Sequence, residues 1–238
     1  YGNGRIHGEN VDSILVKCDD NRYQMAGVAE GIVGAIKLKL NGAVETISIK
    51  KDGPFHFTSK LKHGDAYEIT LAHQPQDMSC SLSHGAGYVI DNVADISVSC
   101  EPLLFQVGGV VNGLQGSVRL KINDGEELRL SEDGEFSFTT DFVHKALYNV
   151  QIVEQPVGQN CQIARAQGKL AIIDIKNVEI TCSNNQYAIA GRAEGLKSPV
   201  TINLNGEEPV TLESDGEFHF NTRLPFGSEY QVNLDTAL

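Results

Sequence analysis

The chain has 238 residues, a formal net charge of -12 at pH 7 and a pI near 5.0. So acidic a balance argues against a partner with a phosphate backbone, and we expect no nucleic-acid partner. With 41% hydrophobic and 21% charged residues, the composition is ordinary for a globular protein. No apolar run approaches the ~20 residues of a membrane span, so we expect no membrane insertion within this chain.

An internal repeat organises the chain. The motif Asp-Gly-x-Phe-x-Phe begins at Asp52, Asp133 and Asp215, with spacings of 81 and 82 residues. Each period is close to the size at which a domain buries an adequate core, which indicates tandem domains. We predict a closing strand of a preceding truncated repeat over residues 1–19, a first repeat over 20–100 (copy 1), a second over 101–182 (copy 2) and a truncated third over 183–238 (copy 3).

Residues 1–18 read as the end of a repeat. Their equivalents are residues 85–100 and 168–182, where a glycine-rich turn precedes a β-rich run that ends in cysteine. Val16 and Val98 lie two residues before that cysteine and share its face of the strand. The chain starts in mid-repeat, so we expect that any signal peptide, lipid anchor or upstream domain has been removed or left out.

Within each copy the pattern is that of half-buried strands. In copy 1, Ile36, Leu38 and Leu40 alternate with lysines, and this period of two predicts a strand with one buried face. Asn-Gly or Asn-Asp-Gly turns follow, as in tight hairpins. In the repeated motif the two phenylalanines are expected to be buried, which leaves His56 and His219 on the surface.

Copy 3 stops at Leu238, before the segment that closes the other copies. It should therefore lack its final strands and expose an open sheet edge. One hypothesis is that residues 1–18 of a neighbouring molecule add a strand to that edge. The four-residue joints between copies, DDNR, EPLL and SNNQ, predict an extended and fairly stiff array.

The five cysteines follow the same period. We predict disulfides Cys80–Cys100 and Cys161–Cys182, with Cys18 unpaired by truncation; the alternatives are buried free thiols or, with less support from the spacing, zinc ligands. Closing a loop of about 20 residues stabilises a domain by on the order of 3 kcal/mol. Such bridges indicate an extracellular or periplasmic protein.

No residue pattern points to catalysis, a cofactor or a resident metal. The histidines do not cluster, no serine lies in a Gly-x-Ser-x-Gly elbow, and the glycine clusters precede strands rather than helices. Calcium is the open alternative, because Asp19, Asp20 and the Asp-Gly turns offer oxygen ligands. The joints EPLL and SNNQ do not repeat the acidic pair. There is no Trp, so a sugar-binding platform is not expected.

The recurring pattern Gly-x-Val-x-Gly-Leu, alternating strand, Asp-Gly-x-Phe-x-Phe, Tyr-x-Val, Gln-Pro and Cys resembles a tandem repeat of large secreted or surface proteins of bacteria. The first two-thirds of each copy is similar to collagen-adhesin B-type and carboxypeptidase-regulatory modules. This resemblance implies prealbumin-like or immunoglobulin-like antiparallel β-sandwiches. The B-type modules often carry a Lys–Asn isopeptide crosslink, whereas the opening strands here contain no lysine.

These observations predict an all-β, non-enzymatic structural repeat. We expect a stalk or spacer that holds a distal domain away from a bacterial cell, with neighbouring repeats of the same chain as its partners. Two alternatives remain: an adhesin-type module that contacts a protein ligand, or an accessory domain of a secreted enzyme.

Overall fold

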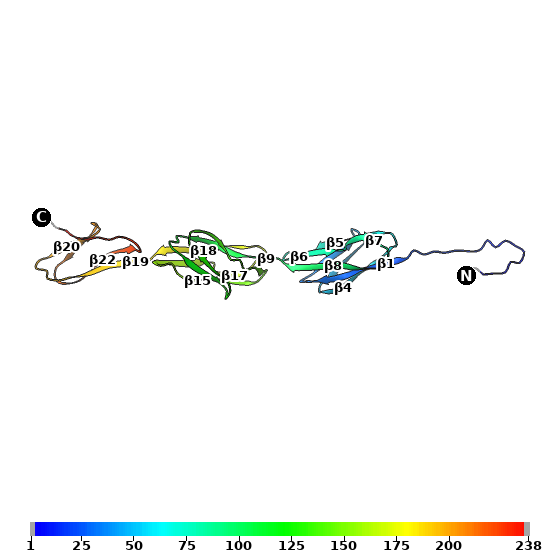
Figure 1. Ribbon diagram of the computed structural model, residues 1–238, viewed down its shortest axis with the longest axis horizontal. Coiled ribbons are helices and arrows are strands. Elements are labelled where there is room, and N and C mark those ends of the chain that lie inside the picture. The colour runs from blue at the N-terminus through cyan, green and yellow to red at the C-terminus, as the bar shows by residue number, and fades with distance from the viewer. Residues whose placement is uncertain (1–2, 236–238) are drawn as a thin grey trace. The chain divides into compact units, whose positions relative to one another are not determined.

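The computed structural model describes residues 3–235, in which all regular secondary structure is β-strand (Figure 1). No helix within residues 3–235 is long and apolar enough to cross a membrane. The chain divides into two compact units, Tyr1–Leu103 and Leu104–Leu238. Unit 1 contains copy 1 and the segment before it, and unit 2 contains copies 2 and 3. The finer boundaries at residues 19 and 182 stay a prediction.

Copy 1 is a sandwich of two four-stranded sheets, ordered β4-β1-β8-β6 and β3-β2-β5-β7. Its strands are β1 Arg22–Glu30, β2 Ile36–Leu40, β3 Glu45–Ile49, β4 Gly53–Lys62, β5 Ala66–His73, β6 Met78–Ser83, β7 Ala86–Tyr88 and β8 Val93–Pro102. Alternate residues of each strand face the interior, as Ile36, Leu38 and Leu40 do on β2. The ring of Phe57 is fully buried and stands edge-on to Phe55, with the ring centroids 6.3 Å apart.

Copy 2 repeats this architecture. Its main sheets are ordered β13-β10-β18-β16 and β12-β11-β15-β17, and β14-β9 forms a separate two-stranded sheet. The strands are β9 Leu104–Phe105, β10 Val107–Asn112, β11 Val118–Ile122, β12 Glu127–Leu130, β13 Gly134–Ser137, β14 Phe142–Val143, β15 Leu147–Glu154, β16 Gln159–Ala164, β17 Gln167–Lys169 and β18 Ile175–Asn184. The opening strand is interrupted at Gln106, so β9 and β10 together take the place of β1.

Copy 3 is an incomplete sandwich in the described residues. It has a two-stranded sheet β19-β22 and a three-stranded sheet β21-β20-β23. The strands are β19 Gln186–Ala193, β20 Val200–Leu204, β21 Glu208–Leu212, β22 Gly216–Pro225 and β23 Val232–Leu234. Its hydrophobic core is small, and the buried residues in it are Ile202, Leu204 and Phe220.

The strand expected over residues 1–19 does not form. Residues 3–21 contain no strand, because a lone extended segment has no neighbour to bond its backbone N–H and C=O groups. The first two residues lie outside the described part of the chain.

Candidate functional site

Each complete copy is closed by its first and last strands, which lie side by side and parallel. In copy 1, β1 pairs with β8 in the register Met25↔Val93 and Ala29↔Val98, and in copy 2 β10 pairs with β18 in the same way. We call β1–β8 and β10–β18 the closing pairs. Because the chain enters a copy on one strand of the pair and leaves it on the other, every closing pair lies between the two ends of its domain.

Glycines allow the two strands of a closing pair to approach. A Cβ atom on Gly27 would lie 2.1 Å from the carbonyl oxygen of Ile96. At the end of the strand Gly31 has a φ of +73°, and a Cβ there would lie 2.0 Å from the carbonyl oxygen of Cys100. Real side chains cannot come so close to backbone, so glycine is required here. In copy 2, Gly109 takes the role of Gly27 against β18.

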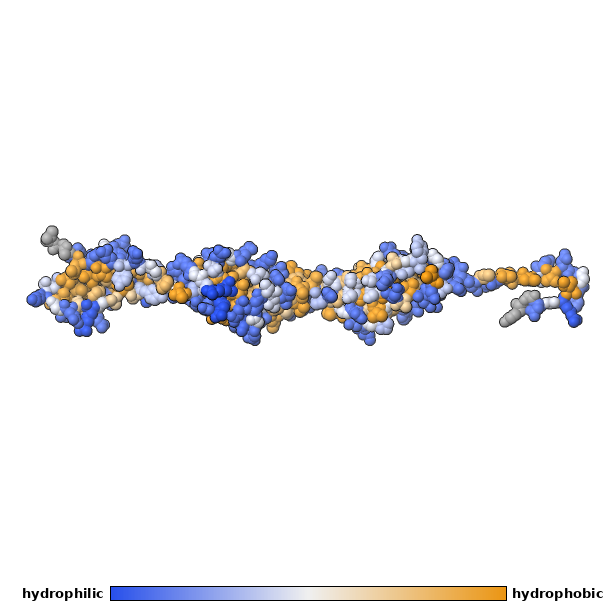
Figure 2. All heavy atoms as spheres, viewed as in Figure 1, coloured by the Kyte–Doolittle hydropathy of each residue, from blue (hydrophilic) through white to orange (hydrophobic). Residues whose placement is uncertain are grey.

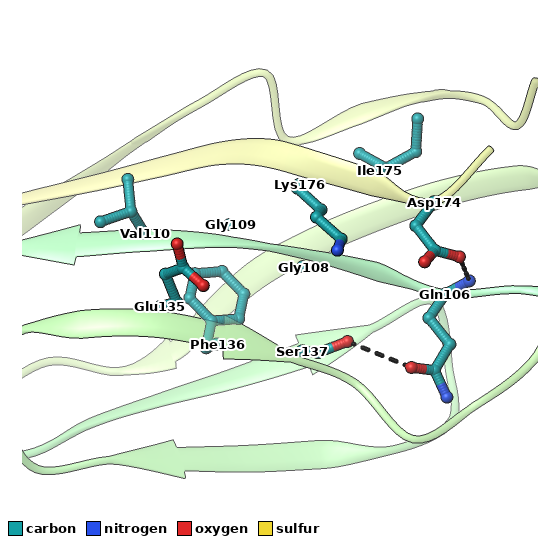
Figure 3. A pocket seen from close by; sticks show the side chains of 10 residues that line it. All are labelled: Gln106, Gly108, Gly109, Val110, Glu135, Phe136, Ser137, Asp174, Ile175 and Lys176. Carbon is teal, nitrogen blue, oxygen red and sulfur yellow. Dashed lines mark hydrogen bonds between the residues drawn. The ribbon is translucent and has the colours of Figure 1, made fainter.

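A side-chain oxygen just before the closing strand binds the backbone of the opening strand. Asn92 Oδ1 accepts the N–H of Gln24 at 2.9 Å. Asp174 Oδ1 accepts the N–H of Gln106, also at 2.9 Å (Figure 3). Sequence reasoning missed this contact, although the signal was present: Asn10, Asn92 and Asp174 all precede their closing cysteine by eight residues.

Disulfides attach the closing strand to its other neighbour. The structure contains the bonds Cys80–Cys100 and Cys161–Cys182, which join β6 to β8 and β16 to β18 at directly opposed positions. The closing strand is thus held by backbone pairing on one side and by a covalent bond on the other. Cys18 is a free, exposed thiol.

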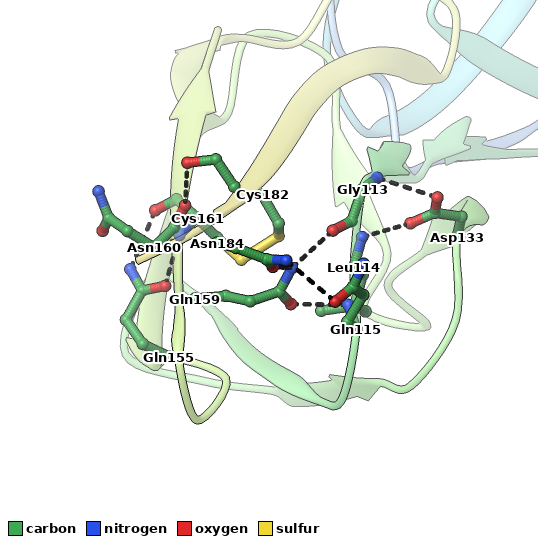
Figure 4. The surroundings of a disulfide bond; sticks show 11 residues. Gly113, Leu114, Gln115, Asp133, Gln155, Gln159, Asn160, Cys161, Cys182 and Asn184 are labelled. Atoms are coloured by element: carbon green, nitrogen blue, oxygen red, sulfur yellow. Dashed lines mark hydrogen bonds between the residues drawn. A yellow bond between two sulfur atoms is a disulfide. The ribbon is translucent and has the colours of Figure 1, made fainter. Parts of the chain in front are cut away.

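In copy 2, the side chains of two glutamines form hydrogen bonds to backbone groups around the disulfide (Figure 4). Gln155 accepts the N–H of Cys161 at 2.7 Å and donates to its carbonyl oxygen at 2.9 Å. Gln159 is buried, donates to the carbonyl oxygen of Gly113 at 2.8 Å and accepts the N–H of Gln115 at 2.6 Å. A buried amide with its partners satisfied is costly to disrupt, so the disulfide is anchored to the turn after β10.

The aspartates of the repeated motif bind the turn after the opening strand. Asp133 accepts the N–H groups of Gly113 and Leu114 at 2.9 and 2.7 Å. Asp215 accepts the corresponding pair in copy 3, and Asp52 accepts the N–H of Ile32 in copy 1. The bonds from the backbone of residues 195 and 196 lower the pKa of Asp215. These carboxylates, proposed as calcium ligands in the alternative above, already have donors within the chain. Within residues 3–235 no three His, Cys, Asp or Glu side chains are grouped to hold a metal ion.

A glutamate bridges the two sheets in every copy. Glu45 at the start of β3 accepts N–H groups from Thr58 and Ser59 of β4 at 2.9 and 2.7 Å. Burial raises the pKa of Glu45, but the bonds from Thr58 and Ser59 outweigh it and hold that pKa at about 2. Glu126 and Glu208 accept equivalent bonds, and their pKa values are also lowered. Sequence reasoning overlooked these residues, although all three copies have glutamate there.

A shallow hollow lies over the sheet of copy 2, between β13, β10 and β18 (Figure 3). It exists because Gly108 and Gly109 place no side chains there, and Glu135, Ser137 and Lys176 surround it. The hydroxyl of Ser137 bonds its neighbour's carbonyl oxygen, and the lining contains no histidine or cysteine. The hollow therefore offers no nucleophile paired with a base.

The surface histidines of the repeated motif are exposed, as expected for His56 and His219. Two tyrosines of copy 3 are more exposed than their counterparts in copy 1. Tyr230 is 60% exposed, whereas the equivalent Tyr67 is 8% exposed; Tyr187 is 47% exposed, whereas the equivalent Tyr23 is partly buried. In copy 1 the ring of Tyr67 lies against Gly87 of β7, and residues 183–235 form no strand equivalent to β7.

Two comparisons with known proteins give no match: none of the protein-family models matches the sequence, and a search of curated proteins finds none either. Among solved structures, the chain is similar to the Bacillus anthracis TIE protein, with a TM-score of 0.59 and 12% identity over 91% of this chain and 45% of that chain. The chain thus spans less than half of the TIE chain. At this identity the likeness establishes the fold alone, and it confirms the expected all-β fold built from antiparallel β-sandwiches.

Two further structures are matched at lower similarity. Two B repeat units of the collagen-binding protein of Staphylococcus aureus have 16% identity and a TM-score of 0.31, over 91% of this chain and 69% of that chain. A streptococcal ancillary pilin has 13% identity and a TM-score of 0.28, over 91% of both chains. TM-scores this low support no argument beyond the one made from TIE.

Proposed function

We propose that this chain is a non-enzymatic stalk or spacer of a bacterial cell-surface or secreted protein, and that it holds a distal domain away from the cell. The fold shared with TIE, the disulfides and the two complete sandwiches in one chain support this role. The observation that carries it is the parallel closing pair of each complete copy.

A stalk is pulled from its two ends, and the two parallel strands of the closing pair are oriented so that they resist this pull. Tension enters copy 1 at Arg22 and leaves at Pro102, so it pulls β1 and β8 in opposite directions along their axes. Their evenly spaced hydrogen bonds are then loaded together, in shear, rather than one after another. Five pairs of residues share the load in this register.

The disulfide limits the length of chain that a copy can release when it unfolds under force. Once β1 has detached, force passes from Cys80 to Cys100 through the bond, and the 20-residue interval between them stays closed. The 81 residues from Arg22 to Pro102 could extend to at most ~280 Å, of which the disulfide retains ~70 Å. An oxidised copy therefore lengthens less when it yields.

Single-molecule stretching of the full chain from its ends tests the proposal. Oxidised copies should unfold at high force in steps that become ~70 Å longer per disulfide after reduction. The control places the handles at residues 22 and 62, which are antiparallel partners at one end of β1 and β4, so that the same domain is unzipped. Equal unfolding forces in the two geometries would contradict a load-bearing role.

A second candidate, an adhesin-type contact with a protein ligand, is favoured by one observation. Tyr88, the last residue of β7, and Ile90 just after this strand are each 74% exposed in copy 1, and copy 2 has Lys169 and Ala171 in their place. Exposed apolar side chains that differ between the copies favour a contact surface at this end of copy 1. Replacement of Tyr88 and Ile90 by serine should then abolish adhesion of particles coated with the chain, while stretching behaviour stays unchanged.

A further inference from the structure

The disulfide-bearing strands of the complete copies, β6 and β16, lie at the edges of their sheets. Within residues 3–235, β6 pairs with β8 alone and β16 with β18 alone. An edge strand carries backbone N–H and C=O groups on its outer side, and a strand of another molecule can bind them. The outer sides of β6 and β16 are therefore places where a complete copy could pair with a further strand.

The cysteines show which backbone groups face outward. Cys80 lies directly opposite Cys100 with a Cα–Cα distance of 4.0 Å, and Cys161 lies opposite Cys182 at 3.9 Å. Antiparallel residues that approach so closely form a non-hydrogen-bonded pair, because hydrogen-bonded pairs lie about 5.5 Å apart. The N–H and C=O groups of Cys80 and Cys161 thus point away from the partner strand and toward the outer side.

A glutamine side chain occupies this outer side in copy 2 (Figure 4). Gln155 accepts the N–H of Cys161 at 2.7 Å and donates to the carbonyl oxygen of the same residue at 2.9 Å. An added strand would make this same pair of bonds. Two residues earlier on β16, the N–H of Gln159 donates to the carbonyl oxygen of Pro156 at 3.3 Å. The segment Gln155–Pro156 therefore takes the place of a strand along the first part of β16.

Copy 1 has the same arrangement, built on Gln74 and Pro75. Gln74 accepts the N–H of Cys80 and donates to the carbonyl oxygen of Met78, both at 3.1 Å. The N–H of Met78 donates to the carbonyl oxygen of Pro75 at 3.2 Å. In both copies the glutamine precedes the cysteine by 6 residues. Each complete copy thus satisfies the outward-facing groups near its disulfide from within.

Little of either edge stays free. Outward-facing residues recur at every second position of a strand, so those after the cysteines are Leu82 and Ile163. The strands end one residue later, at Ser83 and Ala164. Strand addition takes its affinity from successive main-chain hydrogen bonds, and one remaining residue does not supply such a series.

The opposite edge of the same sheet is also bound by a side chain. In copy 1 the outer strand there is β4, and the carboxylate of Glu45 accepts the N–H groups of Thr58 and Ser59 on it. In copy 2, Glu126 binds the backbone just after β13 in the same way. Charged groups at a strand edge oppose pairing with another strand, so both edges of this sheet are closed by side chains of the copy itself.

Backbone groups are the main feature that these edge strands offer to a partner. Their exposed side chains are small or polar, as are Ser79 and Ser81 on β6 and Asn160 and Gln162 on β16. Figure 2 shows hydrophilic residues interspersed with hydrophobic ones over the visible face of both complete copies. A side chain that binds the backbone therefore controls whether the edge can pair.

We propose that Gln74 and Gln155 close the outer sides of β6 and β16 and thereby prevent complete copies from pairing strand to strand. Tandem copies need such a device, because joints of four residues keep similar domains at a high effective concentration. Misassembly between similar domains is a characteristic failure of repeat proteins. The two glutamines act on backbone groups, so they exclude an added strand whatever its side chains.

The test measures the mass of the full chain by light scattering after size-exclusion chromatography, over a wide range of concentration. Cys18→Ser is present in the parent and in every variant, because Cys18 is an exposed thiol. Gln155→Leu removes both bonds to Cys161, and its mass should rise above the 25.8 kDa of a single chain. The concentration that gives a doubled mass should be at least ~10-fold lower than for the parent, as two freed hydrogen bonds predict.

Gln162→Leu is the matched control, since it makes the same substitution on the exposed face of β16 and leaves the bonds of Gln155 in place. Gln155→Glu separates a loss of stability from an open edge. Its carboxylate still accepts the N–H of Cys161 but cannot donate to the carbonyl oxygen, and its charge opposes a second strand. Both variants should have the mass of the parent at every concentration. Gln74→Leu is an independent second variant and should associate through β6.

Hydrogen exchange of peptides from β16 measures the edge directly. The amide of Cys161 should be protected in the parent, because Gln155 accepts its N–H. In Gln155→Leu this protection should be lost at low concentration and return at high concentration, when a second strand binds. A glutamine that only stabilised the fold would give the loss without the return. Protection of β11 in the same experiment verifies that copy 2 is folded.

Equal masses of Gln155→Leu and the parent at every concentration would overturn the proposal, and so would equal association of Gln162→Leu or Gln155→Glu. Neither result would affect the stalk role, since the stretching experiment loads β1 against β8 and leaves the outer side of β6 untouched.

Discussion

Replacement of Glu45 by glutamine should destabilise copy 1 at neutral pH and leave it almost unchanged in strong acid. The carboxylate of Glu45 accepts two backbone N–H groups and the hydroxyl of Thr58 from β4, and its pKa falls from 4.5 to about 2. That fall corresponds to an upper bound of about 3 kcal/mol. Solvent screening at a partly exposed group reduces the expected contribution to about 1–2 kcal/mol.

The sign of the pH dependence follows from the lowered pKa. A carboxylate whose pKa is lower in the folded than in the unfolded state stabilises fully above the unfolded value and loses its contribution as protons bind. The stabilisation by Glu45 should therefore be complete above pH 4.5 and nearly gone at pH 2. In Glu45→Gln the neutral amide lacks this contribution at every pH.

The assay is the denaturant dependence of hydrogen exchange, measured by mass spectrometry on peptides from copy 1 at pH 7 and pH 2. Peptide resolution is needed because the chain contains more than one cooperative domain. The control Glu68→Gln removes an equal charge from the exposed face of β5 and should shift neither curve. A Glu45→Gln deficit that is as large at pH 2 as at pH 7 would refute the assignment of this pKa to the bridge between the sheets.

Two further substitutions test the core and the closing pair. Phe57→Ala removes a fully buried ring and should destabilise copy 1 by about 3–5 kcal/mol, whereas His56→Ala on the exposed face should cost little; similar losses would contradict the assigned faces. Gly109→Ala would put a Cβ 1.7 Å from the carbonyl oxygen of Val178 and should abolish exchange protection of β10, whereas Gly125→Ala, with 3.6 Å to its nearest neighbour, should be tolerated. Retained protection in Gly109→Ala would show that the closing strand does not approach there.

Local patterns in the sequence were sufficient to predict the fold class. Strict alternation at Ile36, Leu38 and Leu40 and the two phenylalanines of the repeated motif set which face of each strand is buried. The sequence shows these signals because successive side chains of a strand point to opposite faces. In every strand of a sandwich the buried residues therefore recur at every second position. The repeat period also showed that Cys80 and Cys100 occupy the same positions in copy 1 as Cys161 and Cys182 in copy 2.

Contacts between distant residues were not accessible in the same way. The parallel register of β1 with β8 joins residues about 70 positions apart, and no local pattern specifies parallel neighbours. The bond from Asn92 to the backbone of Gln24, and the bridge from Glu45 to β4, involve ordinary polar residues whose role appears only once their partners are in place. Comparison among the copies shows that similar residues recur at the positions of Asn92 and Glu45, but it does not show which residues they contact.

Residues 3–18 show the division most clearly. Their sequence is that of a closing strand, and the apolar period alone is enough to recognise it. Whether it becomes a strand depends on a neighbour, because extended backbone needs hydrogen-bond partners that an α-helix supplies from within itself. The tertiary structure therefore decided what the sequence pattern could not: residues 3–21 form no strand, whereas the equivalent residues of copies 1 and 2 form β8 and β18.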